Sequence, residues 1–237
     1  MTSQTAGRKR FYETVTVAQQ GSGVFAVQLD GRSIRTPGGK LLALPTKELA
    51  QAIAEEWAAQ GETILPATLP LTRLANSAID GVADREMDVA NDILKFAASD
   101  LICYRAAYPA GLAEEQARSW DPVLSWVKEK YDAPFVTGVG IAHVTQPEAS
   151  LEALRLAIGA LSPFKLTALH AMTTLTGSAL IALAHAGGGL DTARAWSAAQ
   201  VDEDWQVLHW GEDYEAAQSR KNRLSEFKSA SLFFILS

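Results

Sequence analysis

The most informative stretch for the fold is residues 44–61, LPTKELAQAIAEEWAAQG. Within it the repeat of apolar positions changes from that of strands to that of helices. Leu49, Ile53 and Trp57 recur every fourth residue, a spacing that places them on one face of a helix. Thr46 stands where the N-cap of that helix is expected. The stretch therefore predicts a helix that starts after Thr46 and uses Trp57 as a structural anchor.

Upstream of this helix the chain alternates and turns often, as strands do. Asp30-Gly31 matches a two-residue hairpin turn, because glycine tolerates the positive φ that such a turn requires. The strands that we expect around it cover residues 11–17, 24–29, 32–36 and 41–44. Together they predict an antiparallel meander.

Two prolines, Pro66 and Pro70, follow the helix and remove backbone donors, so we expect an irregular connector there. We place the domain boundary just beyond it. Residues 1–72 should form a small β-rich domain that includes the helix near residues 46–60, and residues 73–237 a larger helical domain. The predicted fold class is therefore α+β, with an N-terminal antiparallel β domain followed by a helical domain.

Helical patterns fill the second part of the chain. Residues 168–186 are its most apolar stretch, but two histidines and Lys165 just before it favour a buried core helix over a membrane span. An apolar stripe predicts a helix over residues 82–98, and another is expected over residues 191–209. Proline directly after a capping residue predicts that Asp121-Pro122 starts or kinks a helix, and Pro147 and Ser162-Pro163 mark two further helix starts.

Composition narrows the classes of partner. The 237 residues are 48% apolar and 20% charged, as in ordinary globular proteins. A net charge of −6 repels nucleic acid and anionic lipid, so neither is an expected partner. The single cysteine, Cys103, has no partner for an internal disulfide and is expected to be a small buried side chain. Residues 1–10 contain no apolar run, which argues against a secretory signal.

The usual catalytic motifs are missing. Gly38-Gly39-Lys40 lacks the earlier glycine of a phosphate loop, and Gly138-Val139-Gly140 has His143 where a dinucleotide motif needs its third glycine. No two of the four histidines have the i, i+4 spacing that puts metal ligands on one helical face, and no Gly-x-Ser-x-Gly elbow occurs. We therefore expect no enzyme activity, no metal, no cofactor and no bound nucleotide.

Carboxylates form the one dense polar feature of the sequence. Asp202, Glu203 and Asp204 lie together, and Glu212 and Asp213 follow shortly after. Three consecutive helical residues point about 100° apart, so these side chains do not converge on one ion. The cluster is either a solvated face or a docking surface for a basic partner. In the second case the nearby tryptophans would add apolar contact; they are Trp196, Trp205 and Trp210.

Whole phrases of the chain resemble the assembly chaperones for the α subunit of F-type ATP synthase, a family of mitochondria and some bacteria. The first phrases are Lys9-Arg10-Phe11-Tyr12, Leu29-Asp30-Gly31-Arg32, Thr36-Pro37, Leu44-Pro45-Thr46, Glu55-Glu56-Trp57 and Pro70-Leu71-Thr72. The later ones are Asp100-Leu101-Ile102-Cys103-Tyr104-Arg105, Trp120-Asp121-Pro122, Thr176-Gly177-Ser178, and Glu203 with Trp210-Gly211-Glu212-Asp213. Their order and spacing extend over nearly the whole chain, although Leu69 stands where the family has methionine.

The resemblance implies a chaperone that binds the unassembled α subunit, masks the surface later covered by the β subunit, and leaves as the hexamer forms. It also implies an important acidic residue, which maps onto Glu203, with Asp202 as the neighbouring candidate. We expect Trp205, Trp210, Glu212 and Asp213 to complete the partner-binding set, and Trp57, Trp120 and Asp121 to be structural.

Two other functions remain as alternatives. One is a magnesium-dependent enzyme that uses the Asp202/Glu203 cluster, and the other is an adaptor with a different client. The resemblance places the protein in the cytoplasm if it is bacterial and in the mitochondrial matrix if it is eukaryotic. No amphipathic presequence is visible, which is expected either of a bacterial protein or of a sequence that lacks its transit peptide, and the bacterial cytoplasm is favoured.

Overall fold

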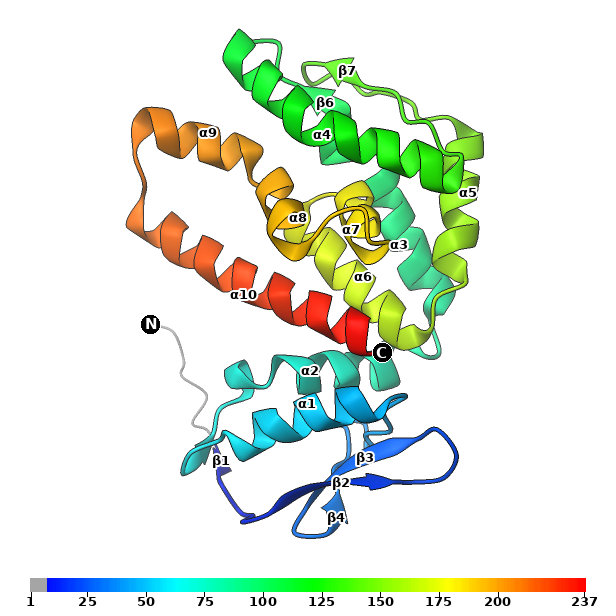
Figure 1. Ribbon diagram of the computed structural model, residues 1–237, viewed down its shortest axis with the longest axis vertical. Helices are drawn as coiled ribbons and strands as arrows, with labels where there is room; N and C mark the ends of the chain where they lie inside the picture. The colour runs from blue at the N-terminus through cyan, green and yellow to red at the C-terminus, as the bar shows by residue number, and fades with distance from the viewer. Residues whose placement is uncertain (1–7) are drawn as a thin grey trace.

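The computed structural model describes residues 8–237 and places a small β-containing part at one end of a stack of helices (Figure 1). The prediction that residues 1–10 form no secretory signal rests mostly on residues 1–7, which lie outside the described residues. Among the described helices, none is both long and apolar enough to cross a membrane. The predicted α+β class, with short antiparallel strands before a helical domain, is confirmed.

The meander is a three-stranded antiparallel sheet with the strand order β2-β3-β4. Its strands are β2 (Val15–Gln19), β3 (Phe25–Leu29) and β4 (Arg32–Ser33). Leu29 pairs with Arg32 across the expected two-residue turn, in which Asp30 and Gly31 both have positive φ. A second small sheet pairs β1 (Arg8–Lys9) with β5 (Thr63–Ile64).

Three of the four expected strands differ from the prediction, and the one expected over residues 32–36 ends at Ser33. The strand expected from residue 11 begins only at Val15, because the Asp30 carboxylate accepts hydrogen bonds from the backbone N–H groups of Glu13 and Thr14. These two N–H groups are therefore not available to pair with a neighbouring strand. Residues 41–44 form only isolated bridges, through Leu41 and Leu44, rather than a strand.

The predicted helix is α1 (Lys47–Ala58), and the Thr46 hydroxyl accepts from the backbone N–H of Leu49 at 3.2 Å. Leu49 and Ile53 are fully buried against β2 and β3. Part of the expected irregular connector is helical, as η1 (Pro66–Thr68) and α2 (Pro70–Ser77). Proline does not prevent this, since it occupies the first turn of each helix, where no backbone donor is needed.

Side chains of α1 hold the start of α2. The Glu56 carboxylate accepts from the backbone N–H groups of Leu71 (2.6 Å) and Thr72 (2.9 Å), which a helix leaves unpaired at its N-terminus. Burial raises the pKa of Glu56, and these hydrogen bonds oppose the rise. The indole N–H of half-buried Trp57 donates to the Thr72 hydroxyl at 3.1 Å. Trp57 therefore lies where an anchor between the two parts is expected.

Trp57→Phe is expected to lower the free energy of unfolding by about 1 kcal/mol more than Trp126→Phe does, because only Trp57 loses an indole hydrogen bond. Trp126 is the matched control, since no hydrogen bond of its indole occurs among the described residues. Urea denaturation of both variants measures the difference. Equal losses would show that the bond to Thr72 contributes nothing.

The helical part continues through a π-helical turn, η2 (Ala78–Val82), into a packed stack (Figure 1). Its first elements are α3 (Glu86–Ala98), η3 (Leu101–Cys103), β6 (Tyr104–Arg105), α4 (Ala110–Tyr131), β7 (Gly138–Val139) and α5 (Glu148–Gly159). They are followed by α6 (Pro163–Thr176), α7 (Ala179–Ala186), α8 (Thr192–Ala199), α9 (Val201–Trp210) and α10 (Tyr214–Leu236). β6 and β7 pair in parallel.

Of the two possibilities predicted at Asp121-Pro122, the helix start is wrong, because both residues lie inside α4. Proline in a helix interior removes a hydrogen bond and costs about 3 kcal/mol. Packing offsets that loss here, since Trp120, Val123 and Val127 are all buried on one stripe around the proline. The predicted starts at Pro147 and Ser162-Pro163 are confirmed.

Two other expected helices are each divided in two. The apolar stretch 168–186 breaks at Gly177, which has a φ of 69° and ends α6. Ser178 then caps α7 by accepting from the backbone N–H of Ile181 at 3.0 Å. The helix expected over 191–209 breaks at Gln200 into α8 and α9. In contrast, the charged residues after Asp213 and the apolar residues 232–236 at the end of the chain belong to a single long helix, α10.

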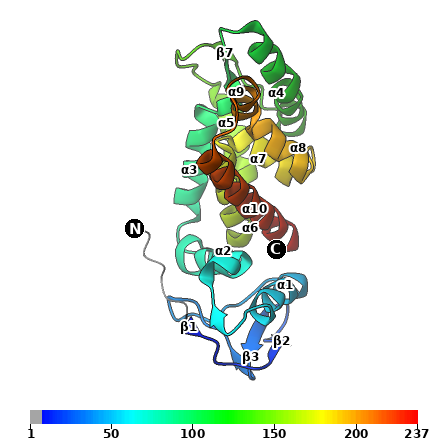
Figure 2. The same ribbon diagram turned by 90° about the vertical axis from the view of Figure 1, so that its left-hand side faces the viewer.

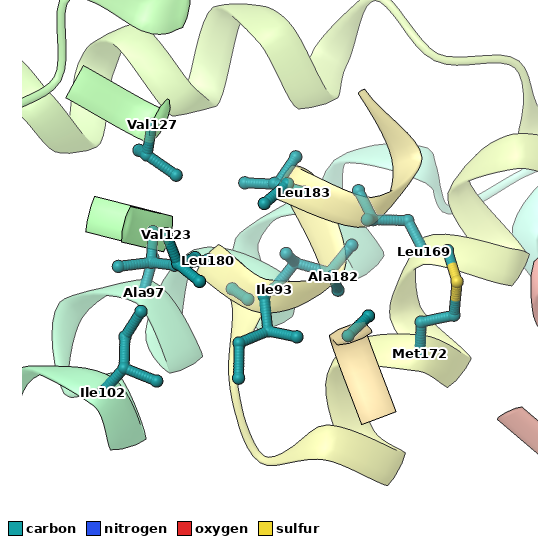
Figure 3. Close-up of a cluster of buried hydrophobic side chains, with 14 of the residues drawn as sticks. Ile93, Ala97, Ile102, Val123, Val127, Leu169, Met172, Leu180, Ala182 and Leu183 are labelled. Carbon is teal, nitrogen blue, oxygen red and sulfur yellow. The ribbon is translucent and has the colours of Figure 1, made fainter. Parts of the chain in front are cut away.

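The main core lies among α3, α4, α6 and α7 (Figure 3). Cys103 is buried in it, as expected, and burial raises the pKa of its thiol to about 12. A second cluster joins the two parts of the molecule. In it Phe233 of α10 packs with Leu49 and Ile53, and its ring stacks on Phe164 at 5.8 Å.

A carboxylate of the helical part also holds a turn of the β-containing part. Asp80 accepts from the Thr36 hydroxyl at 2.8 Å and from the backbone N–H of Gly38 at 2.7 Å. The division at residue 72 stays a prediction, since α2 spans that position.

Candidate functional site

Helix α9 lies at the outer side of the helical stack, between α8 and α10 (Figure 1, Figure 2). Of its ten residues only Val201 is buried. Leu208 and Trp210 are 78% and 77% exposed, and Tyr214, at the start of α10, is 82% exposed. Helices on protein surfaces normally turn such apolar side chains inward. The exposed apolar groups mark this helix as a candidate contact for another protein.

A hollow of about 470 Å³ lies on one side of α9, against the start of α4 and the segments that carry β6 and β7. Asp202, Trp205 and Trp210 reach it from α9. Tyr108 and Ile141, both highly exposed, line it from the opposite side. Apolar and aromatic groups thus face one carboxylate across a concave surface.

A second hollow, of about 310 Å³, lies between α9 and the first turns of α10. Glu203 and Glu212 line it together with Arg220, and Trp210 lines both hollows. We call α9, these two hollows and Tyr214 the α9 surface. It combines an exposed tryptophan at its centre with carboxylates on either side.

The three consecutive carboxylates point in different directions, as their helical spacing predicts. Asp202 accepts from the Gln116 side-chain amide at 2.7 Å, Glu203 pairs with Arg223 at 2.7 Å, and Asp204 pairs with Arg220. Among the residues that the structure describes, no three His, Cys, Asp or Glu side chains gather in a way that could hold a metal ion. The arrangement gives no support to the magnesium-enzyme alternative.

Glu203 is half-buried, with 33% of its side chain exposed, because α10 lies alongside α9 and brings Arg223 against it. Asp202 is also half-buried, but it faces the larger hollow with the tryptophans. Between the two acidic candidates, Asp202 is therefore the one directed toward the apolar concave surface, while Glu203 ties α9 to α10.

The remaining partner-binding candidates have distinct positions. Trp205 is half-buried and stacks on the ring of His209 at 4.2 Å. Glu212 is exposed in the turn between α9 and α10. Asp213 caps α10 by accepting from the backbone N–H of Ala216 at 2.9 Å, so at least part of its role is structural.

Trp120 and Asp121 both contact Arg105, which lines the larger hollow of the α9 surface. The Trp120 indole donates to the Ala198 carbonyl at 2.7 Å, and Asp121 pairs with Arg105 at 2.8 Å. The Arg105 guanidinium also lies 5.2 Å from the centre of a Trp120 ring. These contacts support the structural roles expected for both residues and position β6 at the edge of the hollow.

Two residues that support this surface were missed at the sequence level. Buried Gln116 joins Asp202 to the backbone N–H of Ala106, at 2.7 Å to each. Its signal was a polar residue on the otherwise apolar stripe of α4. Gly111 leaves room for Trp205, since a Cβ there would lie 2.8 Å from the indole ring. Nothing near Gly111 in the sequence indicates this contact.

Comparisons with known proteins agree with one another. A family model described as "ATP12 chaperone protein" matches residues 9–128. Protein atp12, mitochondrial, of Schizosaccharomyces pombe is 26% identical over 221 residues, which cover 88% of this chain and 75% of that protein.

Solved structures are similar over almost the whole chain. The crystal structure of Atp12 from Paracoccus denitrificans has a TM-score of 0.92 at 40% identity and covers 97% of this chain and 98% of its own. A D202K mutant of that Atp12p, numbered as in that protein, has the same TM-score and identity. The Atu1473 protein of Agrobacterium tumefaciens has a TM-score of 0.93 at 43% identity, covering 96% of this chain and 85% of its own.

Proposed function

The chain belongs to the ATP12 chaperone family, the ATP synthase assembly chaperones that its motifs resemble, and we propose that it holds the unassembled α subunit of F-type ATP synthase. The α9 surface is the proposed contact. The subunit would be released as the catalytic hexamer forms, when the β subunit covers the same face. Relatives occur in bacteria and in mitochondria. We propose that this protein works in the compartment in which the hexamer is built, which is the cytoplasm of a bacterium or the mitochondrial matrix.

One observation carries the assignment of the surface. Trp210 is 77% exposed and stands between two hollows that are lined with carboxylates. Tryptophan is among the residues that dominate binding energy at interfaces, and rims of polar groups commonly surround such residues. A partner with an apolar projection and neighbouring basic or amide groups would fit both hollows. Masking of that projection would keep the partner from aggregating before assembly.

Co-expression with the α subunit tests the proposal, followed by size exclusion without added nucleotide. We expect a complex that elutes before either protein alone. The β subunit, co-expressed in the same way, should not be retained. An α subunit that elutes alone, while another cellular protein co-elutes with the chain, would favour the adaptor alternative instead.

Glu203→Lys is expected to weaken capture of the α subunit roughly ten-fold or more, because it reverses the charge at one hollow. It should also lower stability by about 1 kcal/mol, since lysine then faces Arg223 in place of the present ion pair. Binding titration and thermal melting measure the two effects. Glu129→Lys, an exposed position on α4, is the matched control and should change neither.

A charge swap separates the two roles of Glu203. Glu203→Lys combined with Arg223→Glu restores the ion pair between α9 and α10 but leaves lysine at position 203. We expect the melting temperature to recover while capture stays weak. Full recovery of capture would mean that Glu203 acts only by holding α9 in place.

A further inference from the structure

A hollow at the β-containing end of the molecule is separate from the α9 surface. It has a volume of about 720 Å³ and is lined by residues in and around the two small sheets. The strands of these sheets lie far from α9 in both views (Figure 1, Figure 2). The floor of the hollow is apolar, with Leu29, Ile64 and Ile34 among the lining residues. We call this hollow the N-terminal groove.

An aromatic row runs along the floor of the N-terminal groove. Phe11 is 56% exposed and meets Tyr12 edge-on, with 5.4 Å between ring centres. Tyr12 in turn lies 5.8 Å from Trp57. The hydroxyl of Tyr12 donates to the Trp57 carbonyl at 2.7 Å, which fixes the middle of the row. The row offers a rigid apolar surface, and Phe11 is its open end.

The rim of the groove is basic. Arg8, Arg32 and Arg35 line it, all three are exposed, and none forms an ion pair within residues 8–237. The Arg8 guanidinium lies 4.7 Å from the centre of the Phe11 ring, and Arg35 donates to the Gly39 carbonyl at 2.8 Å. The guanidinium of Arg32 makes no hydrogen bond within the described chain. Most N–H donors of these three guanidinium groups are therefore available to a ligand.

Asp30 is the one acidic residue among those that line the groove. Its carboxylate accepts from the backbone N–H groups of Glu13 and Thr14 and from the Thr14 hydroxyl, at 2.8 to 3.3 Å. Hydrogen bonds from Thr14 and Glu13 lower the pKa of Asp30, so it stays ionised and committed to the turn. It does not neutralise the rim by pairing with an arginine.

Charge is divided unevenly along the chain. Residues 1–40 contain six basic and two acidic side chains, a formal charge of +4, so the remaining residues carry −10 of the total of −6. A basic groove on an otherwise acidic protein selects for acidic ligands by complementarity. Arginine binds carboxylates through paired N–H donors, and the aromatic row suits an apolar side chain.

We propose that the N-terminal groove binds an extended acidic segment of a partner protein, whose carboxylates pair with Arg8, Arg32 and Arg35 while an apolar side chain between them rests on Phe11. A free phosphate would use the arginines and leave the aromatic row uncovered. A lipid surface would reach the rim but not the concave floor. A peptide that carries both kinds of group uses the rim and the floor together, and this site is independent of the α9 surface.

The test uses the full chain and a fluorescein-labelled peptide of alternating glutamate and leucine, about nine residues long and so ~30 Å when extended. Fluorescence anisotropy should show saturable binding. Arg32→Glu and Phe11→Ala should each weaken it roughly ten-fold. Lys128→Glu makes the same charge change on α4 and should leave binding unchanged. Thermal melting verifies that all three variants are folded.

Four outcomes would overturn the proposal. They are equal weakening by Lys128→Glu, equal binding of a lysine and leucine peptide, complete displacement by inorganic phosphate at matched ionic strength, and Arg32-dependent binding of phosphatidylserine vesicles in place of the peptide. The first two would indicate unspecific attraction. The third would indicate an anion site and the fourth a membrane contact.

Discussion

Asp100→Ala is expected to lower the free energy of unfolding by about 3 kcal/mol, the largest loss of stability among the substitutions considered. Asp100 is fully buried. Its two carboxylate oxygens cap two different elements, accepting from the backbone N–H of Ile102 in η3 at 3.2 Å and of Leu180 in α7 at 3.0 Å. Alanine would leave both donors buried without a partner.

Chemical denaturation of Asp100→Ala at neutral pH measures the loss. Asp84→Ala is the control, because Asp84 is exposed and its one ion pair among the described residues, to Lys40, faces the solvent. It should change stability by about 0.5 kcal/mol or less. A loss below about 1 kcal/mol for Asp100→Ala would mean that η3 and α7 do not depend on this carboxylate.

Asp100 also predicts a pH dependence. Burial raises its pKa to about 6, although hydrogen bonds from Ser178, Leu180 and Ile102 oppose the rise. The folded state therefore holds this proton more tightly than the unfolded state, where the pKa is about 3.9. The contribution to stability is complete below about pH 3.9 and is lost as the pH rises through about 6.

Asp100→Asn isolates that contribution, because asparagine does not titrate. The stability of the parent protein relative to Asp100→Asn should fall by roughly 1–3 kcal/mol between pH 4 and pH 7. Urea denaturation of both proteins across this range measures the difference. A difference that stays constant with pH would contradict the raised pKa.

The parts of the fold with strong local signals could be predicted from the sequence. Thr46 and the stripe that contains Leu49 and Ile53 predicted α1, and Asp30-Gly31 predicted the hairpin, because capping and turn chemistry involve neighbouring residues. Pro122 misled the prediction for α4, since a local rule was outweighed by the burial of Trp120 on the same stripe. Only the tertiary packing contains that information.

Helix α10 illustrates a second limit. Its first half is polar around most of its circumference, so it lacks the apolar period that reveals a helix. Its end is nevertheless anchored by Phe233 in the cluster shared with α1.

The candidate site could be predicted only in part for the same reason. Asp202 and Trp210 came from a local phrase, whereas Gln116 and Arg223 reach the α9 surface from distant elements, and nothing near either residue in the sequence links it to this surface.

Trp210→Ala is expected to weaken capture of the α subunit by about 30-fold, or ~2 kcal/mol, the effect of removing a central tryptophan from an interface. Trp210 is exposed, and its ring lines both hollows of the α9 surface. Its removal should change the stability of the isolated protein by about 0.5 kcal/mol or less, since little of it is packed. Binding and stability should therefore separate at this position.

The matched control is Leu156→Ala, which removes an equally exposed apolar side chain, 70% exposed, from α5. It should leave both capture and melting temperature unchanged. Loss of capture in this variant would mean that the partner contacts a wider apolar surface than the one around α9.

Titration of the purified α subunit with the parent protein, Trp210→Ala and Leu156→Ala, without nucleotide, tests most directly that the α9 surface holds this subunit. We expect tight binding by the parent and by Leu156→Ala, and binding about 30-fold weaker by Trp210→Ala at an unchanged melting temperature. Equal binding by all three proteins, or no binding by the folded parent, would show that the α9 surface does not hold the α subunit.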